Sequence, residues 1–221
     1  MVAGQTIYIN DMTSNRSLVK KIFEDFSEQY FDLYMNVDLY SGALDYLADL
    51  TEEGQKQLLD LGCGPANLSY YLDKQIDGLK ITGIDLSEKM ISLAKQNLPE
   101  GKFITSDIMD LPEFNHQFDI ILLGFIIPYL SPVETQSLLA TLSDLISESG
   151  LLYISAIDAK LTSDDKETKP NAFKQYLYGH DDLEQILSKH SFELKKSFSQ
   201  VQNMDSEIII VAQKKSAKTL S

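Results

Sequence analysis

An acid and two glycines stand close together in the stretch LLDLGCGPANLSYYL, residues 58–72, and their spacing could build a binding loop. Asp60 closes an apolar run, and Gly62 and Gly64 follow it before helical spacing resumes. Glycine lets the backbone turn tightly and approach a ligand without a Cβ atom in between. The following helix would present its N-terminus to that ligand. The acid favours a ligand that carries positive charge.

Two further side chains could take part in chemistry. His180 precedes a predicted helix, and imidazole has an ordinary pKa of about 6.5, so His180 is the best candidate general base. A surface histidine ahead of a helix fits the same pattern. Tyr129 follows a predicted strand on the ligand side and is a candidate pocket residue, although a core aromatic residue would look the same.

Short apolar runs alternate with helical patterns through most of the chain, which predicts a parallel, doubly wound sheet with right-handed crossovers. Ligands bind such a sheet at the carboxyl ends of the strands, where the strand order switches, so the glycine loop lies at the binding edge. The expected strands are 57–62, 79–85, 102–108, 118–125 and 151–157, and the expected helices are 67–75, 87–98 and 131–149.

The two ends of the chain have different patterns. Residues 191–202 and 206–215 are β-rich and separated by a short turn, which predicts an antiparallel hairpin. A helix from Asp181 to about His190 leads into it, with Asp181 and Glu184 as an expected capping box. Helical patterns over 17–34 and 41–50 predict an N-terminal cap.

The expected fold class is α/β. It is a doubly wound Rossmann-like sheet of about seven strands, mostly parallel with one antiparallel strand in a C-terminal hairpin, plus an N-terminal helical cap. Residues 1–50 would form the cap and residues 51–221 the binding domain, effectively as one domain. The polar stretch at about 158–180 leaves the fifth strand at its carboxyl end and is expected to form a substrate lid.

Composition excludes several classes of function. The chain has 221 residues and a net charge of −14, so a phosphate backbone is repelled and nucleic acid is not expected as a partner. Cys63 is the single cysteine, which rules out an internal disulfide and fits a reducing, cytoplasmic setting. We find no apolar run long enough to cross a membrane, no signal peptide and no metal-ligand spacing.

The glycine stretch resembles the first motif of the class I S-adenosylmethionine-dependent methyltransferases, in the GCG variant common among small-molecule enzymes. Residues 81–98, ITGIDLSEKMISLAKQNL, resemble the second motif, and residues 103–112, FITSDIMDLP, resemble the third. The fourth and fifth strand regions continue the likeness, which covers residues 57–213. It implies S-adenosyl-L-methionine as the cofactor.

The resemblance also implies roles for individual residues. Asp85 would hold the ribose hydroxyls, and Asp107 would accept a hydrogen bond from the adenine amine. Tyr30 or Tyr34 in the cap could reach the cofactor carboxylate. The remaining residues expected at the cofactor are Asp60, Gly62, Cys63, Gly64, Asn67, Leu86, Met90, Ser106, Ile108 and Gly124.

Two features depart from the family pattern. Ala66 stands where glycine is usual, and Gly124 to Tyr129 contain none of the histidines or aspartates often found after the fourth strand. The expected activity is in-line methyl transfer to a small molecule, mostly by positioning and desolvation, in a monomer or homodimer. A non-catalytic cofactor-binding sensor is the alternative. A nicotinamide-dependent oxidoreductase is disfavoured, because Asn67 breaks the dinucleotide fingerprint and no Tyr-x-x-x-Lys pair is found near the pocket.

Overall fold

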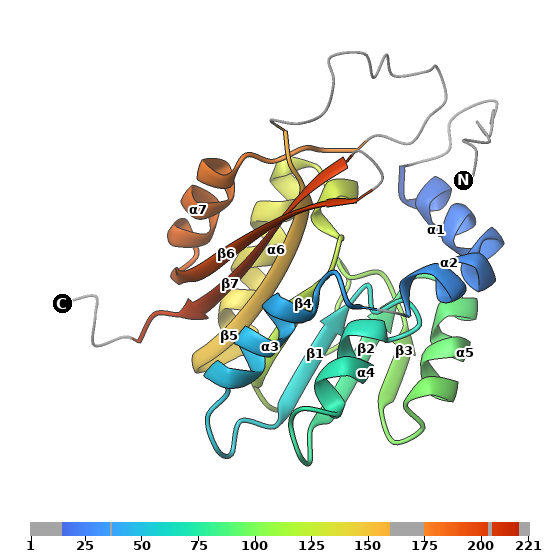
Figure 1. Cartoon of the computed structure of the whole chain (residues 1–221), viewed down its shortest axis with the longest axis horizontal. Coiled ribbons are helices and arrows are strands. Elements are labelled where there is room, and N and C mark those ends of the chain that lie inside the picture. The colour runs from blue at the N-terminus through green and yellow to red at the C-terminus, as the bar shows by residue number, and fades with distance from the viewer. Residues whose placement is uncertain (1–14, 36, 160–174, 203–204, 217–221) are drawn as a thin grey trace.

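A seven-stranded sheet runs through the centre of the protein, in the order β3-β2-β1-β4-β5-β7-β6 (Figure 1). The computed structural model describes residues 15–35, 37–159, 175–202 and 205–216. The strands are β1 (Gln57–Leu61), β2 (Lys80–Asp85), β3 (Lys102–Thr105), β4 (Phe118–Leu123), β5 (Ile146–Ile157), β6 (Phe192–Gln202) and β7 (Asp205–Lys214).

Strands β1 to β5 are parallel, and β7 is the antiparallel strand, pairing with β5 on one side and β6 on the other. The strand order reverses between β1 and β4, which lie side by side in the middle of the sheet. A crevice opens beyond the carboxyl ends of the strands at such a switch point. The expected fold class, with its C-terminal hairpin, is confirmed.

Helices cover both faces of the sheet, so its central strands are apolar on both sides. Leu58 of β1 packs in the core on the face of α3, α4 and α5, and its neighbour Leu59 packs in the core on the face of α6 and α7. These helices are α3 (Ser41–Leu50), α4 (Asn67–Asp73), α5 (Glu88–Asn97), α6 (Pro132–Leu145) and α7 (His180–Lys189). None of the described helices combines the length and the apolar composition that a membrane crossing needs.

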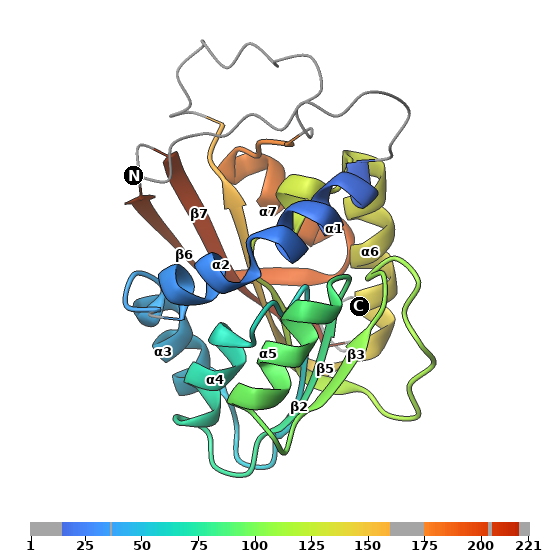
Figure 2. The same ribbon diagram turned by 90° about the vertical axis from the view of Figure 1, so that its right-hand side faces the viewer.

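The N-terminal cap lies across the carboxyl edge of the sheet (Figure 2). It consists of α1 (Asn15–Asp25) and α2 (Ser27–Tyr34), whereas the sequence predicts one continuous helix over 17–34. Phe26 separates them, because its ψ of 17° takes the backbone out of the helical region. The break lets both helices follow the rim of the sheet.

Two further local predictions are wrong. Helix α6 ends at Leu145 and not at Ser149, because Ile146 already pairs with Phe118 and the strand then bulges to a positive φ of 62° at Ser149. Helix α7 begins after Gly179, whose N–H donates to the Asp182 carboxylate at 3.0 Å, so Asp181 and Glu184 are not its capping box. Most of the expected lid, 160–174, lies outside the described residues.

Candidate active site

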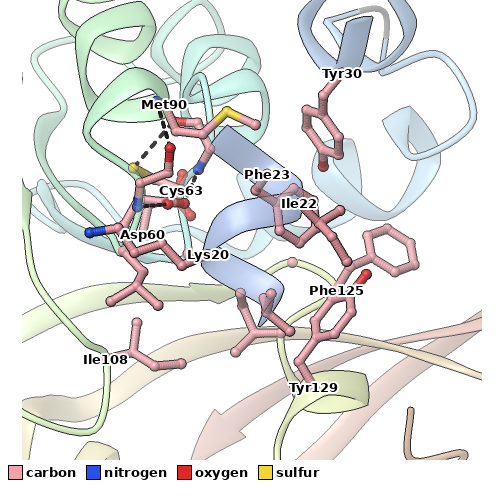
Figure 3. Close-up of a pocket in the computed structure, with 18 of the residues that line it drawn as sticks. Lys20, Ile22, Phe23, Tyr30, Asp60, Cys63, Met90, Ile108, Phe125 and Tyr129 are labelled. Atoms are coloured by element: carbon pink, nitrogen blue, oxygen red, sulfur yellow. Dashed lines mark hydrogen bonds between the residues drawn. The ribbon is translucent and has the colours of Figure 1, made fainter. Parts of the chain in front are cut away.

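A cavity of about 480 Å³ opens at the carboxyl edge of the sheet beneath α1 and α2 (Figure 3). The ends of β1, β2 and β4 supply one side of it, and the cap supplies the other. It therefore lies at the switch point of the sheet, where binding was expected. Its lining contains the predicted residues Tyr30, Asp60, Gly62, Cys63, Gly64, Asn67, Asp85, Leu86, Met90, Asp107, Ile108, Gly124 and Tyr129.

The glycine loop depends on backbone conformations that glycine adopts at low cost. Gly62 and Gly64 have φ of 64° and 53°, and a Cβ atom on Gly62 would lie 1.9 Å from the Ile126 Cδ1 atom. Ala66, where the family usually has glycine, is buried and has a φ of 64° just before α4. A left-handed alanine costs about 1–2 kcal/mol, so this loop stores strain next to the cavity.

Asp60 is a buried acid beneath the loop. Its Oδ2 atom accepts a hydrogen bond from the Ser69 hydroxyl on α4. Burial, together with the nearby Asp85 carboxylate, raises the pKa of Asp60 to about 7, although the Ser69 bond acts in the opposite direction. A cationic ligand in the cavity would stabilise the ionised form of this carboxylate.

Asp85 joins the glycine loop to the end of β2. Its Oδ2 atom accepts from the Gly64 N–H at 2.9 Å, and its Oδ1 atom accepts from the Ser87 N–H at 2.8 Å. Ser87 itself caps α5 by accepting from the Met90 N–H, as expected. Burial raises the pKa of Asp85. The Asp85 carboxylate therefore stabilises the glycine loop and also lines the cavity.

Cys63 has no sign of nucleophilic activation. Its side chain is buried and its N–H donates to the Ile84 carbonyl at 3.0 Å, which joins the loop to β2. Burial raises the pKa of its thiol, and the charges of Asp60 and Asp85 raise it further. Because only the thiolate is a strong nucleophile, Cys63 serves as a small residue that fits the turn.

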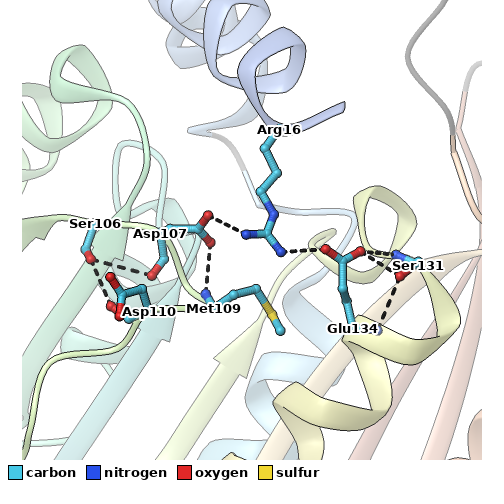
Figure 4. A network of polar contacts seen from close by, with 7 residues as sticks. All are labelled: Arg16, Ser106, Asp107, Met109, Asp110, Ser131 and Glu134. Carbon is cyan, nitrogen blue, oxygen red and sulfur yellow. Dashed lines mark hydrogen bonds and ion pairs between the residues drawn. The ribbon is translucent and has the colours of Figure 1, made fainter. Parts of the chain in front are cut away.

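Arg16 on α1 lies between two acids, Asp107 and Glu134, and pairs with both (Figure 4). One guanidinium nitrogen lies 2.8 Å from Asp107 Oδ2, and the other lies 2.5 Å from Glu134 Oε1 on α6. The second oxygen of Asp107 accepts from the Met109 N–H at 2.9 Å. Sequence reasoning did not find Arg16, because the residues that it joins are far apart in the chain.

Aromatic rings gather on the cap side of the cavity, opposite Asp60 and the glycine loop (Figure 3). The Phe23 ring meets the rings of Tyr30 and Tyr129 edge to face, each at 5.7 Å between centroids. Tyr40 and Phe125 form a similar pair at 5.4 Å. The helical stripe of the cap thus packs partly into the cavity rather than into the core.

Glu207 and Phe125 are among the lining residues that the sequence did not predict. Glu207 lies near the start of β7, is 8% exposed, and accepts from the Gln200 side chain at 2.7 Å. Phe125 has a positive φ of 55° just after β4, and its N–H donates to the Ser155 hydroxyl. A bulky residue in this conformation is rare and costs stability, which is common at binding sites. Glu207 stands in no motif, and Phe125 lies in the fourth strand region but had no predicted role.

Two predicted site residues do not line the described cavity, and the side chain of a third, Tyr34, lies outside the described structure. The Ser106 hydroxyl points back to the Asp110 carbonyl at 3.1 Å. His180 is the first residue of α7 and does not line the described cavity. The segment before His180 runs along η1 (Ile127–Tyr129) and the end of β5. The Tyr176 N–H donates to the Pro128 carbonyl, and the Tyr178 N–H donates to the Ile157 carbonyl. The role of His180 as a base stays an untested prediction.

Comparison with known proteins gives consistent results. Residues 58–150 match a family model described as a methyltransferase domain. A trans-aconitate 2-methyltransferase from Escherichia coli is 33% identical over 117 residues, which is 52% of this chain and 45% of that protein. A tRNA N(3)-methylcytidine methyltransferase from Schizosaccharomyces pombe is 28% identical over 84% of this chain and 66% of that protein. This chain covers only 25–45% of the length of the first curated relatives that it matches.

Among solved structures, a magnesium protoporphyrin IX methyltransferase from Synechocystis, with bound S-adenosylhomocysteine, superposes with a TM-score of 0.74. It is 18% identical and covers 91% of this chain and 100% of its own. The sheet order and the glycine loop agree with the match of residues 58–150 to a methyltransferase domain. Residues 58–150 are thus similar to a methyltransferase domain, and the chain shares the fold of the solved methyltransferase.

Proposed function

We propose that this protein transfers the sulfonium methyl group of S-adenosyl-L-methionine to a small molecule. The observation that carries the proposal is the glycine loop, which lies at the switch point of the sheet and is bound to Asp85 at the end of β2. The residues fit the cofactor, because Gly62 and Gly64 leave bare backbone at the cavity and buried acids face it. When bound, the cofactor supplies an electrophilic methyl group.

Each part of the cavity has a distinct proposed duty. Asp85 would hold the ribose hydroxyls, since its oxygens have lone pairs beyond those used by Gly64 and Ser87. Asp107 would accept from the adenine amine while still paired with Arg16. Tyr30 is the cap residue best placed for the methionine end, because its ring lies 3.7 Å from the position of a Cβ atom on Gly64.

The acceptor would lie against the aromatic side of the cavity. Phe23, Tyr129 and Phe125 line this side and would exclude water from the reacting atoms. Catalysis would then come mostly from orientation and desolvation. A cavity of about 480 Å³ that must also hold the cofactor leaves room for a compact acceptor, which supports a small molecule over a macromolecule.

A pair of aspartate variants tests the proposal. Asp119 also accepts from two backbone N–H groups, those of Lys56 and Gln57, but at the opposite end of β1. Asp85→Asn and Asp119→Asn should therefore lower the free energy of unfolding to a similar extent. Only Asp85→Asn should weaken S-adenosylmethionine binding in calorimetry, by about 1.5–3 kcal/mol, the usual worth of hydrogen bonds to a charged group.

Methyl transfer is followed separately as S-adenosylhomocysteine released with a panel of acceptors. Binding of NAD but not of S-adenosylmethionine by the parent protein would overturn the cofactor assignment. Cofactor binding without transfer to any acceptor would favour the sensor alternative.

A further inference from the structure

The half of the cavity away from the glycine loop is lined mainly by apolar side chains from three parts of the chain. Ile22 and Phe23 come from α1, Phe125 and Tyr129 from the segment after β4, and Ile157 from the end of β5. Figure 3 shows the first four of these together, on the side away from the glycine loop. A ligand that covers this half therefore gains most by burying apolar surface of its own.

The rings of this half are arranged so that a further ring can join them. The rings of Tyr30 and Tyr129 stand nearly perpendicular to that of Phe23, at 79° and 90°. Tyr40 and Phe125 form a second such pair at 62°. In these arrangements the positive edge of one ring meets the negative face of another. A planar aromatic ligand can extend this pattern, whereas a saturated ring of the same size contributes only its area.

The charged side chains of the described lining already have partners within the protein. They are the acids Asp60, Asp85, Asp107 and Glu207 and the cations Arg16 and Lys20. Each acid accepts a hydrogen bond from a side chain or from the backbone. Arg16 pairs with two acids, and Lys20 lies 3.8 Å from Glu24. A charged acceptor would have to give up its water and compete for groups that are already bound, which is costly.

We propose that the methyl acceptor is an uncharged aromatic molecule, whose ring packs against Phe23, Phe125 and Tyr129. This inference rests on the proposed function, because it names the acceptor of the same site. Burial of the ring gives affinity, and its edge-to-face contacts distinguish it from an aliphatic molecule of the same size. Phe23 is then a specificity-determining residue, since its ring contacts two of the neighbouring rings.

The test uses four probes of similar size. 2-Naphthol is aromatic and uncharged at neutral pH, 2-naphthoate is anionic, 2-naphthylmethylamine is cationic, and decahydro-2-naphthol is uncharged but saturated. Their binding to the full-length protein saturated with S-adenosylhomocysteine is measured by calorimetry. We expect 2-naphthol to bind at least tenfold more tightly than either charged probe. It should bind roughly threefold to tenfold more tightly than decahydro-2-naphthol.

Phe23→Leu keeps an apolar side chain and removes the ring. It should lower the affinity for 2-naphthol roughly fivefold and reduce the preference over decahydro-2-naphthol to within about twofold. Phe198→Leu is the matched control, because the Phe198 ring forms an edge-to-face pair with Tyr46 at 6.0 Å and does not line the described cavity. This control should keep the preferences of the parent. Binding of S-adenosylhomocysteine by both variants shows that they are folded.

Failure of the inference differs from failure of the proposed function. If the parent protein does not bind S-adenosylhomocysteine, the proposed function is wrong. If it does bind, then absence of 2-naphthol binding, or a charged probe that binds as tightly as 2-naphthol, overturns the uncharged acceptor. Equal affinity for decahydro-2-naphthol overturns the aromatic acceptor.

The role of Phe23 is decided separately. Retention of the ring preference by Phe23→Leu, or an equal loss of it in Phe198→Leu, overturns that role. The probe series on the parent decides the acceptor class even if Phe23→Leu fails to fold.

Discussion

Asp60 shows how a single buried residue can link the binding site to pH. It is fully buried, lies beneath the glycine loop and has a pKa of about 7 in place of the ordinary 3.8. The unfolded chain loses this proton at lower pH than the folded protein does. Below 3.8 both states hold the proton, and above it the free energy of unfolding falls as the pH rises towards 7.

Cofactor binding should have the opposite pH dependence. A sulfonium and an ammonium group favour the ionised Asp60, so the affinity for S-adenosylmethionine should rise roughly tenfold between pH 6 and pH 8 as this carboxylate ionises. Below pH 7, calorimetry in buffers of different ionisation enthalpy should show proton release on binding. Asp60→Asn should remove the part of the pH dependence of the affinity that comes from this carboxylate. The titration of the cofactor itself affects both proteins equally, so it does not alter their comparison. A parallel slope in the variant would assign the pH dependence to another group.

Helix α1 supplies part of the cover of the cavity. Arg16 joins it to Asp107 beyond β3 and to Glu134 at the start of α6. Glu134 is held in place by Ser131, whose side chain and backbone both donate to it and lower its pKa more than Arg16 does. Helix α1 therefore docks onto an acid that α6 has already positioned.

Arg16→Gln should loosen α1 without unfolding the sheet. Each ion pair is partly exposed, with 38% of the Arg16 side chain accessible, so the two together are worth about 1 kcal/mol. Amide hydrogen exchange over residues 15–25 should speed up roughly fivefold, and exchange in β1 and β4 should not change. Lys21→Gln removes a charge from an exposed position of the same helix and should leave these rates as they are. Equal effects of the two variants would argue against the Arg16 bridge.

The net charge of the whole molecule bears on whether its acceptor is a small molecule or a tRNA, the two kinds named for its relatives. Its net charge is −14, with 33 acidic residues against 19 lysines and arginines. Binding to a nucleic acid normally releases counterions through contacts between basic side chains and phosphates. A chain of this charge is a poor match for the tRNA substrate named for the Schizosaccharomyces relative.

We therefore expect no retention of tRNA in an electrophoretic mobility assay near physiological salt, even at about 10⁻⁴ M protein. The same preparation should bind S-adenosylhomocysteine, which shows that it is active. A shifted band that weakens steeply with salt would reveal a basic surface and reopen the question of a nucleic-acid acceptor.

The local sequence was sufficient to predict the fold class of this protein. Strand and helix alternation, with apolar runs such as Phe118–Leu123, predicts the parallel sheet because burial on both faces demands continuous apolar strands. The glycines at 62 and 64 and the acids at 60 and 85 predict the cofactor side, since they lie within two adjacent loops. Local patterns were weaker at boundaries, as at 146–149, where pairing with Phe118 overrides a helical pattern.

Tertiary structure alone decided the other side of the cavity. Arg16, Phe125 and Glu207 lie in different parts of the chain and meet only because α1 crosses the edge of the sheet and β7 returns beside β5. His180 shows the converse, because it follows a segment expected over the pocket but lies at the start of α7, outside the described lining. The sequence determines contacts between near neighbours in the chain, and distant residues meet only through the packing of the whole fold.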